Sequence, residues 1–197
     1  MIILMRHGET FWNREGRIQG HTESDLTPLG ERQAHAMAGL VADLVRKDGG
    51  DFRLIASPIG RARRTAAMVA DATGLPVELD SRLMEIGCGA WEGRLRSEIA
   101  GFHPEVFQTR EWFFGAPGGE TFEDVAARAT DWLASLPPEP ERRVIAVSHG
   151  VWGRLARGAY AGLDRQATLD QDVPQDAVFR LQAGQIDRLD CTPVKQR

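Results

Sequence analysis

The sequence predicts an α/β fold, a three-layer sandwich in which a mostly parallel central sheet is flanked by helices on both faces. Short apolar runs alternate along the chain with amphipathic segments of helical length. The run Val-Ile-Ala-Val-Ser at 144–148 is almost wholly apolar, as expected of a strand that is covered on both faces. No repeat, low-complexity tract or linker divides the chain, so we expect residues 1–197 to form one domain.

The first half of the chain alternates strand and helix signals. Residues 2–5 are an apolar, strand-like run at the start. A helix is expected from Pro28, because Thr27 is a good N-cap and proline is favoured at the first helical position. Gly49 and Gly50 end this helix. Further along we expect a strand at 52–57, a helix through 65–74 and a strand at 75–79.

The second half contains one irregular segment, at about 82–120. It is rich in glycine and aromatic residues, and we expect loops with a short helix around 96–107. We interpret this segment as a lid or insertion within the domain. The other expected elements are a helix at 122–136, a strand at 144–148, a helix at 151–163 and a β-hairpin at 177–190.

Composition narrows the classes of partner. The formal net charge of -4 gives no overall basic surface, so we expect neither nucleic acid nor an anionic membrane as a partner. The two cysteines, Cys88 and Cys191, have no metal-ligand spacing and are typical of a reducing compartment. The apolar start is too short for a signal peptide, and no stretch approaches the roughly 20 apolar residues of a membrane span. We therefore expect a cytoplasmic protein without a metal site.

Charged and polar residues follow the expected strands. In parallel sheets, ligands bind at the carboxyl ends of the strands. We therefore expect these residues to meet in one crevice. They are Arg6, His7 and Gly8 after the first strand, Arg61 after the second, Glu85 a little beyond the third, and His149, Gly150 and Val151 after the strand at 144–148.

This combination of residues suits a phosphate dianion. Arg6 and Arg61 present planar sets of donors that match phosphate oxygens. The helix that opens at Val151 would add backbone N–H groups and the positive end of its dipole. Gly8 and Gly150 lack a Cβ atom, so an oxyanion could approach their backbone closely.

The same residues suggest phosphoryl transfer. Beside two arginines an imidazole is penalised for carrying charge, so we expect His7 to stay neutral near pH 7 and to act as a nucleophile. A nearby backbone carbonyl would accept a hydrogen bond from its other ring nitrogen. His149 would stabilise the charge of the transition state, and Glu85 would give a proton to the leaving oxygen.

Several ordered motifs resemble one family. They are RHGETFWN at 6–13, GRIQG at 16–20, LTPLGERQA at 26–34, SPIGRARRTA at 57–66, MEIGCGAWEG at 84–93, PGGET at 117–121 and VSHG at 147–150. Together they resemble the signatures of the histidine phosphatase superfamily, which includes the cofactor-dependent phosphoglycerate mutases. The resemblance implies a phosphoglycerate mutase-like fold and an enzyme that uses no metal or organic cofactor.

The resemblance also implies roles for particular residues. His7 is the residue phosphorylated, Arg6, Arg61 and His149 form the phosphate pocket, and Glu85 is the proton donor. Asn13 and Gln19 fall where the family commonly adds polar contacts to the phosphoryl group. Asn13 could instead cap a local turn, but we favour the contact with phosphate. His21, His35 and His103 match no family site, and Trp91 with residues 112–114 more often packs a core or lid.

Two departures bear on the reaction. In the mutases an arginine follows the glutamate and a long insertion carries further basic residues, whereas here Ile86 follows Glu85 and the segment before PGGET reads EWFFGA at 111–116. An apolar wall holds a second acidic group poorly. We therefore favour a metal-independent phosphatase of small phosphorylated metabolites.

Three alternatives remain open. One is a phosphoglycerate mutase, the second is a dedicated metabolic phosphatase such as one for α-ribazole phosphate or a sugar bisphosphate, and the third is a non-catalytic phosphate-binding module. The sequence leaves the oligomeric state open, a homodimer included.

Overall fold

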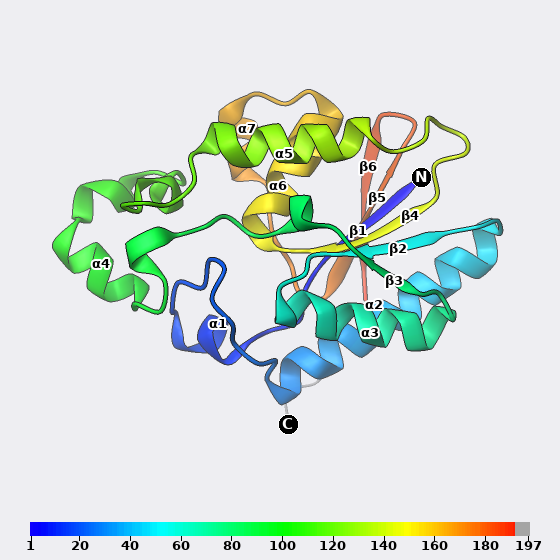
Figure 1. The fold of residues 1–197 in the computed structure, drawn as a ribbon, viewed down its shortest axis with the longest axis horizontal. Coiled ribbons are helices and arrows are strands. Elements are labelled where there is room, and N and C mark those ends of the chain that lie inside the picture. The colour runs from blue at the N-terminus through cyan, green and yellow to red at the C-terminus, as the bar shows by residue number, and fades with distance from the viewer. Residues whose placement is uncertain (192–197) are drawn as a thin grey trace.

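The computed structural model describes residues 1–191 of the chain. Its centre is a six-stranded sheet with the strand order β3-β2-β4-β1-β5-β6, and helices lie against both faces (Figure 1). The pairs β3–β2, β2–β4 and β4–β1 are parallel, and β5 and β6 are antiparallel to their neighbours. The strands are β1 Ile2–Arg6, β2 Arg53–Ala56, β3 Val77–Leu79, β4 Val144–Ser148, β5 Ala177–Gln182 and β6 Gln185–Asp190. The predicted three-layer sandwich with a mostly parallel sheet is confirmed.

The middle of the sheet is buried on both faces because its side chains point alternately into two apolar layers. All five residues of β4 are buried. In β1, Ile2 and Leu4 pack into one apolar cluster, and Ile3 and Met5 pack into another on the opposite face. This is the burial that a continuous apolar run predicts. The carboxyl ends of β1, β2 and β4 consequently meet at one edge of a rigid layer.

Two helices cover one face, α2 Pro28–Asp48 and α3 Gly60–Thr73 (Figure 1). Helix α2 starts as predicted, since the Thr27 side chain accepts a hydrogen bond from the Gly30 N–H. It ends at Gly49, whose φ of 69° lies in the region that favours glycine. Met37 and Val41 of α2 and Val69 of α3 are wholly buried against the sheet.

The other face is covered by α5 Phe122–Ala134 and α6 Gly150–Ala161 (Figure 1). Trp132 and Trp152 pack edge to face between these helices, with ring centroids 5.3 Å apart. Two short helices, α1 Phe11–Glu15 and α7 Arg165–Asp170, are absent from the prediction. Segments of one to two turns carry too little periodicity to be found in a sequence. None of the helices within residues 1–191 is long and apolar enough to cross a bilayer.

The segment at 82–120 is irregular, as predicted, and lies on the same side of the molecule as α1 (Figure 1). The predicted helix at 96–107 is divided into α4 Arg96–Phe102 and a 3-10 turn at Pro104–Gln108, because Pro104 cannot continue an α-helix. The other 3-10 turns are Ser81–Leu83, Gly89–Trp91 and Trp112–Gly115. Stacked rings join three of the four turns, because Phe107 stacks on Trp91, 6.5 Å away, and on Trp112, 4.9 Å away. That the segment moves as a lid stays a prediction.

The turn after β1 packs directly on α2. A Cβ atom added to Gly8 would lie 2.1 Å from the Gly30 carbonyl oxygen, and one added to Gly30 would lie 1.9 Å from that of Glu9. Both partners are backbone atoms, which cannot move aside singly. Two glycines therefore let the turn that carries His7 rest on the start of α2.

Gly8→Ala should lower the free energy of unfolding by about 3 kcal/mol, because the added methyl group forces two backbones apart. Gly39→Ala is the matched control. It lies on α2 with nothing within 4 Å of the added Cβ atom, and it should raise the stability by roughly 0.5–1 kcal/mol. Urea denaturation measures both changes. Equal stability of Gly8→Ala and the wild type would contradict the close packing.

Candidate active site

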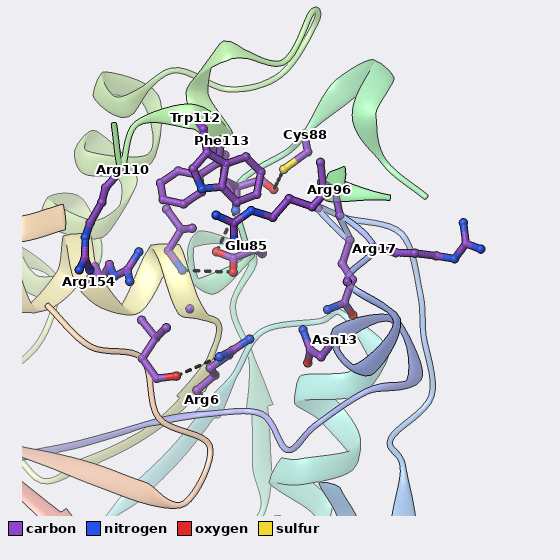
Figure 2. A pocket seen from close by; sticks show the side chains of 18 of the residues that line it. Arg6, Asn13, Arg17, Glu85, Cys88, Arg96, Arg110, Trp112, Phe113 and Arg154 are labelled. Atoms are coloured by element: carbon purple, nitrogen blue, oxygen red, sulfur yellow. Dashed lines mark hydrogen bonds between the residues drawn. The ribbon is translucent and has the colours of Figure 1, made fainter. Parts of the chain in front are cut away.

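A cavity of about 660 Å³ opens at the carboxyl ends of the strands and extends under the segment at 82–120 (Figure 2). Its lining includes most of the residues singled out from the sequence. These are Arg6, His7, Asn13, Gln19, Arg61, Glu85, Gly150 and Val151. Chain segments more than 140 residues apart thus meet in one place, as the strand-end argument expects.

His7 is held as a neutral imidazole with a defined tautomer. It is only 2% exposed, and its Nδ1 lies 2.8 Å from the Gly8 carbonyl oxygen. A carbonyl only accepts, so Nδ1 carries the proton and Nε2 keeps its lone pair. Burial, and then the charges of Arg61 and Arg6, hold the pKa of His7 well below its ordinary value. The lone pair accepts a hydrogen bond from Arg61 Nε at 3.2 Å.

The two arginines of the pocket are held by backbone carbonyls. Arg61 donates to the carbonyls of Thr22 at 2.9 Å and Gly20 at 2.7 Å, and Arg6 donates to that of Val173 at 2.9 Å. Burial lowers the pKa of both guanidiniums, that of Arg6 to about 10. Neither forms an ion pair with a carboxylate of residues 1–191. Their charge is therefore left for an anionic ligand.

His149 lies behind His7, with the two ring centroids 5.3 Å apart. Its Nε2 is 2.7 Å from Ser57 Oγ, which also accepts the Ile59 N–H. Burial comes first among the causes that hold the pKa of His149 well below its ordinary value, followed by the charge of Arg61. Its buried Nδ1 has no hydrogen-bond partner among the described residues. His149 is not among the residues that line the cavity, and its unpartnered Nδ1 is a buried polar atom that calls for a partner.

Glu85 occupies the N-terminus of α6. Its Oε1 accepts the N–H groups of Ile86 at 3.1 Å and Trp152 at 3.0 Å, and its Oε2 accepts that of Val151 at 3.2 Å. The prediction that the Val151 N–H is open to phosphate is therefore wrong for this structure. A carboxylate and a phosphate suit a helix N-terminus for the same reason, and here the carboxylate holds it.

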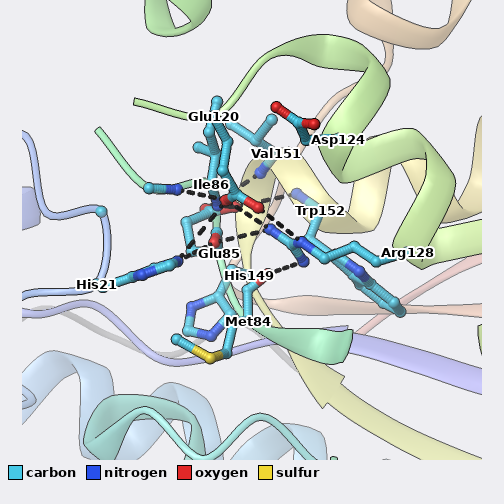
Figure 3. A network of polar contacts seen from close by, with 12 residues as sticks. His21, Met84, Glu85, Ile86, Glu120, Asp124, Arg128, His149, Val151 and Trp152 are labelled. Atoms are coloured by element: carbon cyan, nitrogen blue, oxygen red, sulfur yellow. Dashed lines mark hydrogen bonds and ion pairs between the residues drawn. The ribbon is translucent and has the colours of Figure 1, made fainter. Parts of the chain in front are cut away.

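A second set of contacts fixes the backbone on which Glu85 stands (Figure 3). Arg128 of α5 donates to the carbonyls of Arg82, Met84 and Glu85 and pairs with Glu120 at 3.0 Å. His21 Nε2 donates to the Glu85 carbonyl at 2.7 Å. His21, which matches no family site, also lies 3.8 Å from Glu120 Oε2 and does not line the cavity.

Asn13 and Gln19 share a partner in Thr10. The Thr10 N–H donates to Asn13 Oδ1 at 3.2 Å while Thr10 Oγ1 accepts the Asn13 N–H at 3.1 Å, a capping box at the start of α1. Thr10 Oγ1 also donates to Gln19 Oε1 at 2.9 Å. Asn13 therefore caps a helix, the alternative left open by the sequence, and it lines the cavity as well.

Gly8 is placed differently from the prediction. Its N–H donates to Thr65 Oγ1 at 3.2 Å, and it is not among the residues that line the cavity. Its small size serves packing on α2 rather than close approach of an oxyanion. Gly150 does line the cavity, and a Cβ atom there would lie 3.5 Å from Arg6 Nε and 3.7 Å from Glu85 Oε2.

The outer part of the cavity is basic as well as aromatic, which corrects the prediction of an apolar wall. Trp112 and Phe113 line it, and the Arg96 guanidinium lies 4.9 Å from the centre of the Trp112 ring (Figure 2). Arg110 and Arg154 lie together on the opposite wall (Figure 2). Burial and the charge of Arg110 lower the pKa of Arg154.

The sequence held one signal for these arginines. Arg154 follows Gly150 by four residues, which places it one turn further along the same face of α6. For Arg96 and Arg110 no such signal exists, because their approach depends on how the irregular segment folds over the cavity.

Cysteine and metal chemistry have little support at this site. Cys88 lines the cavity, but burial raises the pKa of its thiol to about 12, so it is a poor nucleophile. Within residues 1–191, no group of three or more histidine, cysteine, aspartate or glutamate side chains is arranged to hold a metal ion.

Comparison with known proteins agrees with the motifs. The model of the histidine phosphatase superfamily (branch 1) matches residues 2–185. A curated relative, the probable phosphoglycerate mutase GpmB of Erwinia tasmaniensis, is 40% identical over 157 residues, which cover 76% of this chain and 69% of the relative. The corresponding protein of Yersinia enterocolitica is 39% identical over 159 residues, with the same coverage.

Solved structures of similar fold have other names. A mycobacterial glucosyl-3-phosphoglycerate phosphatase in complex with VO3 superposes with a TM-score of 0.74 at 28% identity, covering 91% of this chain and 90% of the other. A putative alpha-ribazole-5'-P phosphatase from Escherichia coli has a TM-score of 0.77 at 24% identity, covering 97% and 96%. The second likeness is one of fold alone.

Two buried neutral imidazoles make the stability depend on pH. Below about pH 6.5 the unfolded chain binds protons that the folded protein does not, so the free energy of unfolding falls as the pH decreases. Above that pH the stabilisation from the two neutral histidines is fully present. Each histidine contributes up to about 1.4 kcal/mol per pH unit. Urea denaturation between about pH 5 and pH 8 should show a smaller slope for His149→Asn than for the wild type. The exposed-site control His35→Ala should keep the wild-type slope, and an unchanged slope in His149→Asn would contradict the burial of a neutral ring.

Proposed function

This chain belongs to the histidine phosphatase superfamily, and from that membership we propose that it is a metal-independent phosphatase of small phosphomonoesters. The reaction would proceed through a phosphohistidine at His7. The observation that carries the proposal is the state of His7: a neutral ring whose Nε2 lone pair accepts from Arg61, and whose pKa is lowered by burial and by the charges of Arg61 and Arg6. Such a site binds a phosphoryl dianion and presents a nucleophile to it.

In the first step, His7 Nε2 attacks phosphorus and the bond to the leaving oxygen breaks. Arg61 and Arg6 neutralise the charge that develops on the phosphoryl oxygens. The unpartnered Nδ1 of His149 donates to one of these oxygens, in the tautomer in which the Ser57 hydroxyl donates to Nε2.

Glu85 exchanges the proton. Its Oε1 already accepts two N–H groups, whereas Oε2 accepts one and so retains capacity for a proton. In the first step Glu85 starts with a proton on Oε2 and gives it to the leaving alcohol. In the second step it takes a proton from the water that attacks the phosphohistidine, and inorganic phosphate is released.

The size of the cavity favours hydrolysis. A volume of about 660 Å³ is of the order that holds ligands of drug size, roughly 300–1,000 Å³. A three-carbon phosphoester would leave room for water beside the phosphohistidine. The cavity thus suits either a larger leaving group or ready access of water, and both support a phosphatase.

The outer arginines support a substrate with a second acidic group. Arg96 and Arg154 line the cavity and form no ion pair with a carboxylate of residues 1–191. This observation also keeps a mutase as the second candidate, because a mutase must hold such a group while the phosphoryl group is transferred. The names of the relatives, phosphoglycerate mutase and glucosyl-3-phosphoglycerate phosphatase, both describe phosphoesters of a carboxylic acid.

Other expectations stay proposals of the same kind. A dedicated metabolic phosphatase would share this site, and only a substrate panel separates it from an enzyme of broad specificity. A non-catalytic phosphate-binding module is disfavoured by the complete set of nucleophile, proton donor and charge-stabilising groups. We propose a cytoplasmic location and no nucleic-acid or membrane partner.

With EDTA present, the protein should release inorganic phosphate from p-nitrophenyl phosphate and from at least one phosphorylated acid. His7→Ala should lower kcat/KM at least ~1,000-fold, because no other group can carry the phosphoryl group. Trapping with radiolabelled substrate should label the wild type at His7. Activity of His7→Ala near that of the His35→Ala control would overturn the covalent route. Conversion of 3-phosphoglycerate to 2-phosphoglycerate without phosphate release would establish the mutase instead.

Arg154→Gln should raise KM about 10-fold for a phosphoester with a carboxylate and less than about 3-fold for p-nitrophenyl phosphate, since one charged contact is lost. Glutamine retains a donor for the Gln171 carbonyl, which accepts from Arg154 Nε at 2.7 Å. Steady-state kinetics on the two substrates measure the difference. Arg46→Gln, at an exposed site near the end of α2, is the control and should change neither value. Equal effects of Arg154→Gln on both substrates would contradict a role toward the second acidic group.

A further inference from the structure

Gln175 lies behind the phosphate pocket, just before β5, and does not line the cavity. Its Nε2 is 3.2 Å from the His7 carbonyl oxygen and 3.1 Å from Asn13 Oδ1. One amide nitrogen therefore joins the backbone of the proposed nucleophile to a side chain of the cavity. The motifs of the sequence include no residue of this region.

The partners of Gln175 determine which end of its amide faces them. The His7 carbonyl only accepts hydrogen bonds, so the Gln175 atom beside it must be the nitrogen. The second hydrogen of that nitrogen points to Asn13, and the atom that receives it must be an oxygen.

A second donor gives the same answer for Asn13. The Thr10 backbone N–H, which only donates, is 3.2 Å from the same Oδ1. Two donors thus occupy the oxygen of Asn13, and its NH2 group is the end left for a ligand. Figure 2 shows this side chain at the cavity, on the same side as Arg6. Were the amide reversed, it would present an oxygen to a phosphoryl oxygen, and two acceptors repel.

Gln175 is itself held by the rigid segment that precedes it. The carbonyls of three consecutive residues, Gln171, Asp172 and Val173, each accept a hydrogen bond from an arginine. The donors are Arg154 to Gln171, Arg157 to Asp172 and Arg6 to Val173. Arg157 is 2% exposed and its guanidinium stacks 3.7 Å from the centre of the Phe179 ring on β5. The position of Gln175 is therefore set by the pocket that it serves.

We propose that Gln175 is a positioning residue that sets the polarity of the Asn13 amide, so that Asn13 presents N–H donors to the phosphoryl group. The proposal rests on the proposed function of the cavity as a phosphate site. It assigns specificity for a fully ionised phosphoryl group partly to a residue that does not touch the ligand. Two contacts hold the Asn13 oxygen, one from the Thr10 backbone N–H and one from Gln175, and the contact from Gln175 is the one that a side-chain substitution can remove.

A double-mutant cycle tests this proposal, with the affinity for inorganic phosphate measured by calorimetry. Gln175→Met removes the donor at nearly constant volume, and Gln175→Glu replaces the donor by an acceptor. Each is made in the wild type and in Asn13→Ala. We expect Gln175→Met to weaken phosphate binding about 5-fold and Gln175→Glu at least 10-fold. In the Asn13→Ala background we expect each further change to be less than about 2-fold.

Kinetics and controls separate the outcomes. Gln182→Met, exposed at the far end of β5, is the matched control and should bind phosphate as the wild type does. Thermal melting shows whether each variant is folded. If Gln175→Met and Gln175→Glu weaken phosphate binding by the same factor with and without Asn13, and the wild type binds and hydrolyses phosphoesters, the positioning role is overturned while the proposed function stands. A folded wild type that binds no phosphate would overturn the proposed function and this proposal with it.

Discussion

The site depends on positive charge that is kept buried without being cancelled. Arg6 and Arg61 stand beside His7 and donate to the carbonyls of Val173, Thr22 and Gly20, while the buried Nε of Arg6 has no partner among the described residues. A carbonyl accepts a hydrogen bond from a guanidinium but carries no net charge. A carboxylate would accept the hydrogen bond and would also cancel the positive charge. Burial first, and then this uncancelled charge, lower the pKa of both imidazoles and keep them neutral beside the proposed phosphate site.

The one carboxylate in the pocket is itself controlled. Glu85 is held by three backbone N–H groups, two of which belong to the first turn of α6. Its backbone is held in turn by Arg128 and His21. Through these contacts the carboxylate is kept beside Arg6 without forming an ion pair with it, so the proposed proton donor and the proposed phosphate site remain separate.

Backbone groups therefore orient much of the inner pocket. The Gly8 carbonyl sets the tautomer of His7, the Val173 carbonyl orients Arg6, and the close contact of Gly8 with Gly30 fixes the turn between them. The outer cavity is built differently, from side chains of the irregular segment, among them Arg96 stacked on Trp112.

Local signals in the sequence suffice for the α/β class, for both ends of α2 and the start of α5, and for the convergence of Arg6, His7, Arg61, Glu85 and His149, whereas α3 begins five residues before the helix expected at 65–74. These follow from apolar periodicity, capping residues and the rule that parallel strands end at one edge, all of which are local signals. The hydrogen-bond partners that lie far apart in the sequence are known only from the tertiary structure. Val151 serves Glu85, 66 residues away, rather than phosphate, and Gln175 reaches His7 across 168 residues. These hydrogen bonds depend on differences of a few tenths of an ångström in how the elements are placed, and no spacing along the chain encodes such differences. The basic outer wall has the same cause, since the aromatic residues at 111–116 do not show that Arg96 of α4 stacks on Trp112 or that Arg110 and Arg154 line the opposite wall.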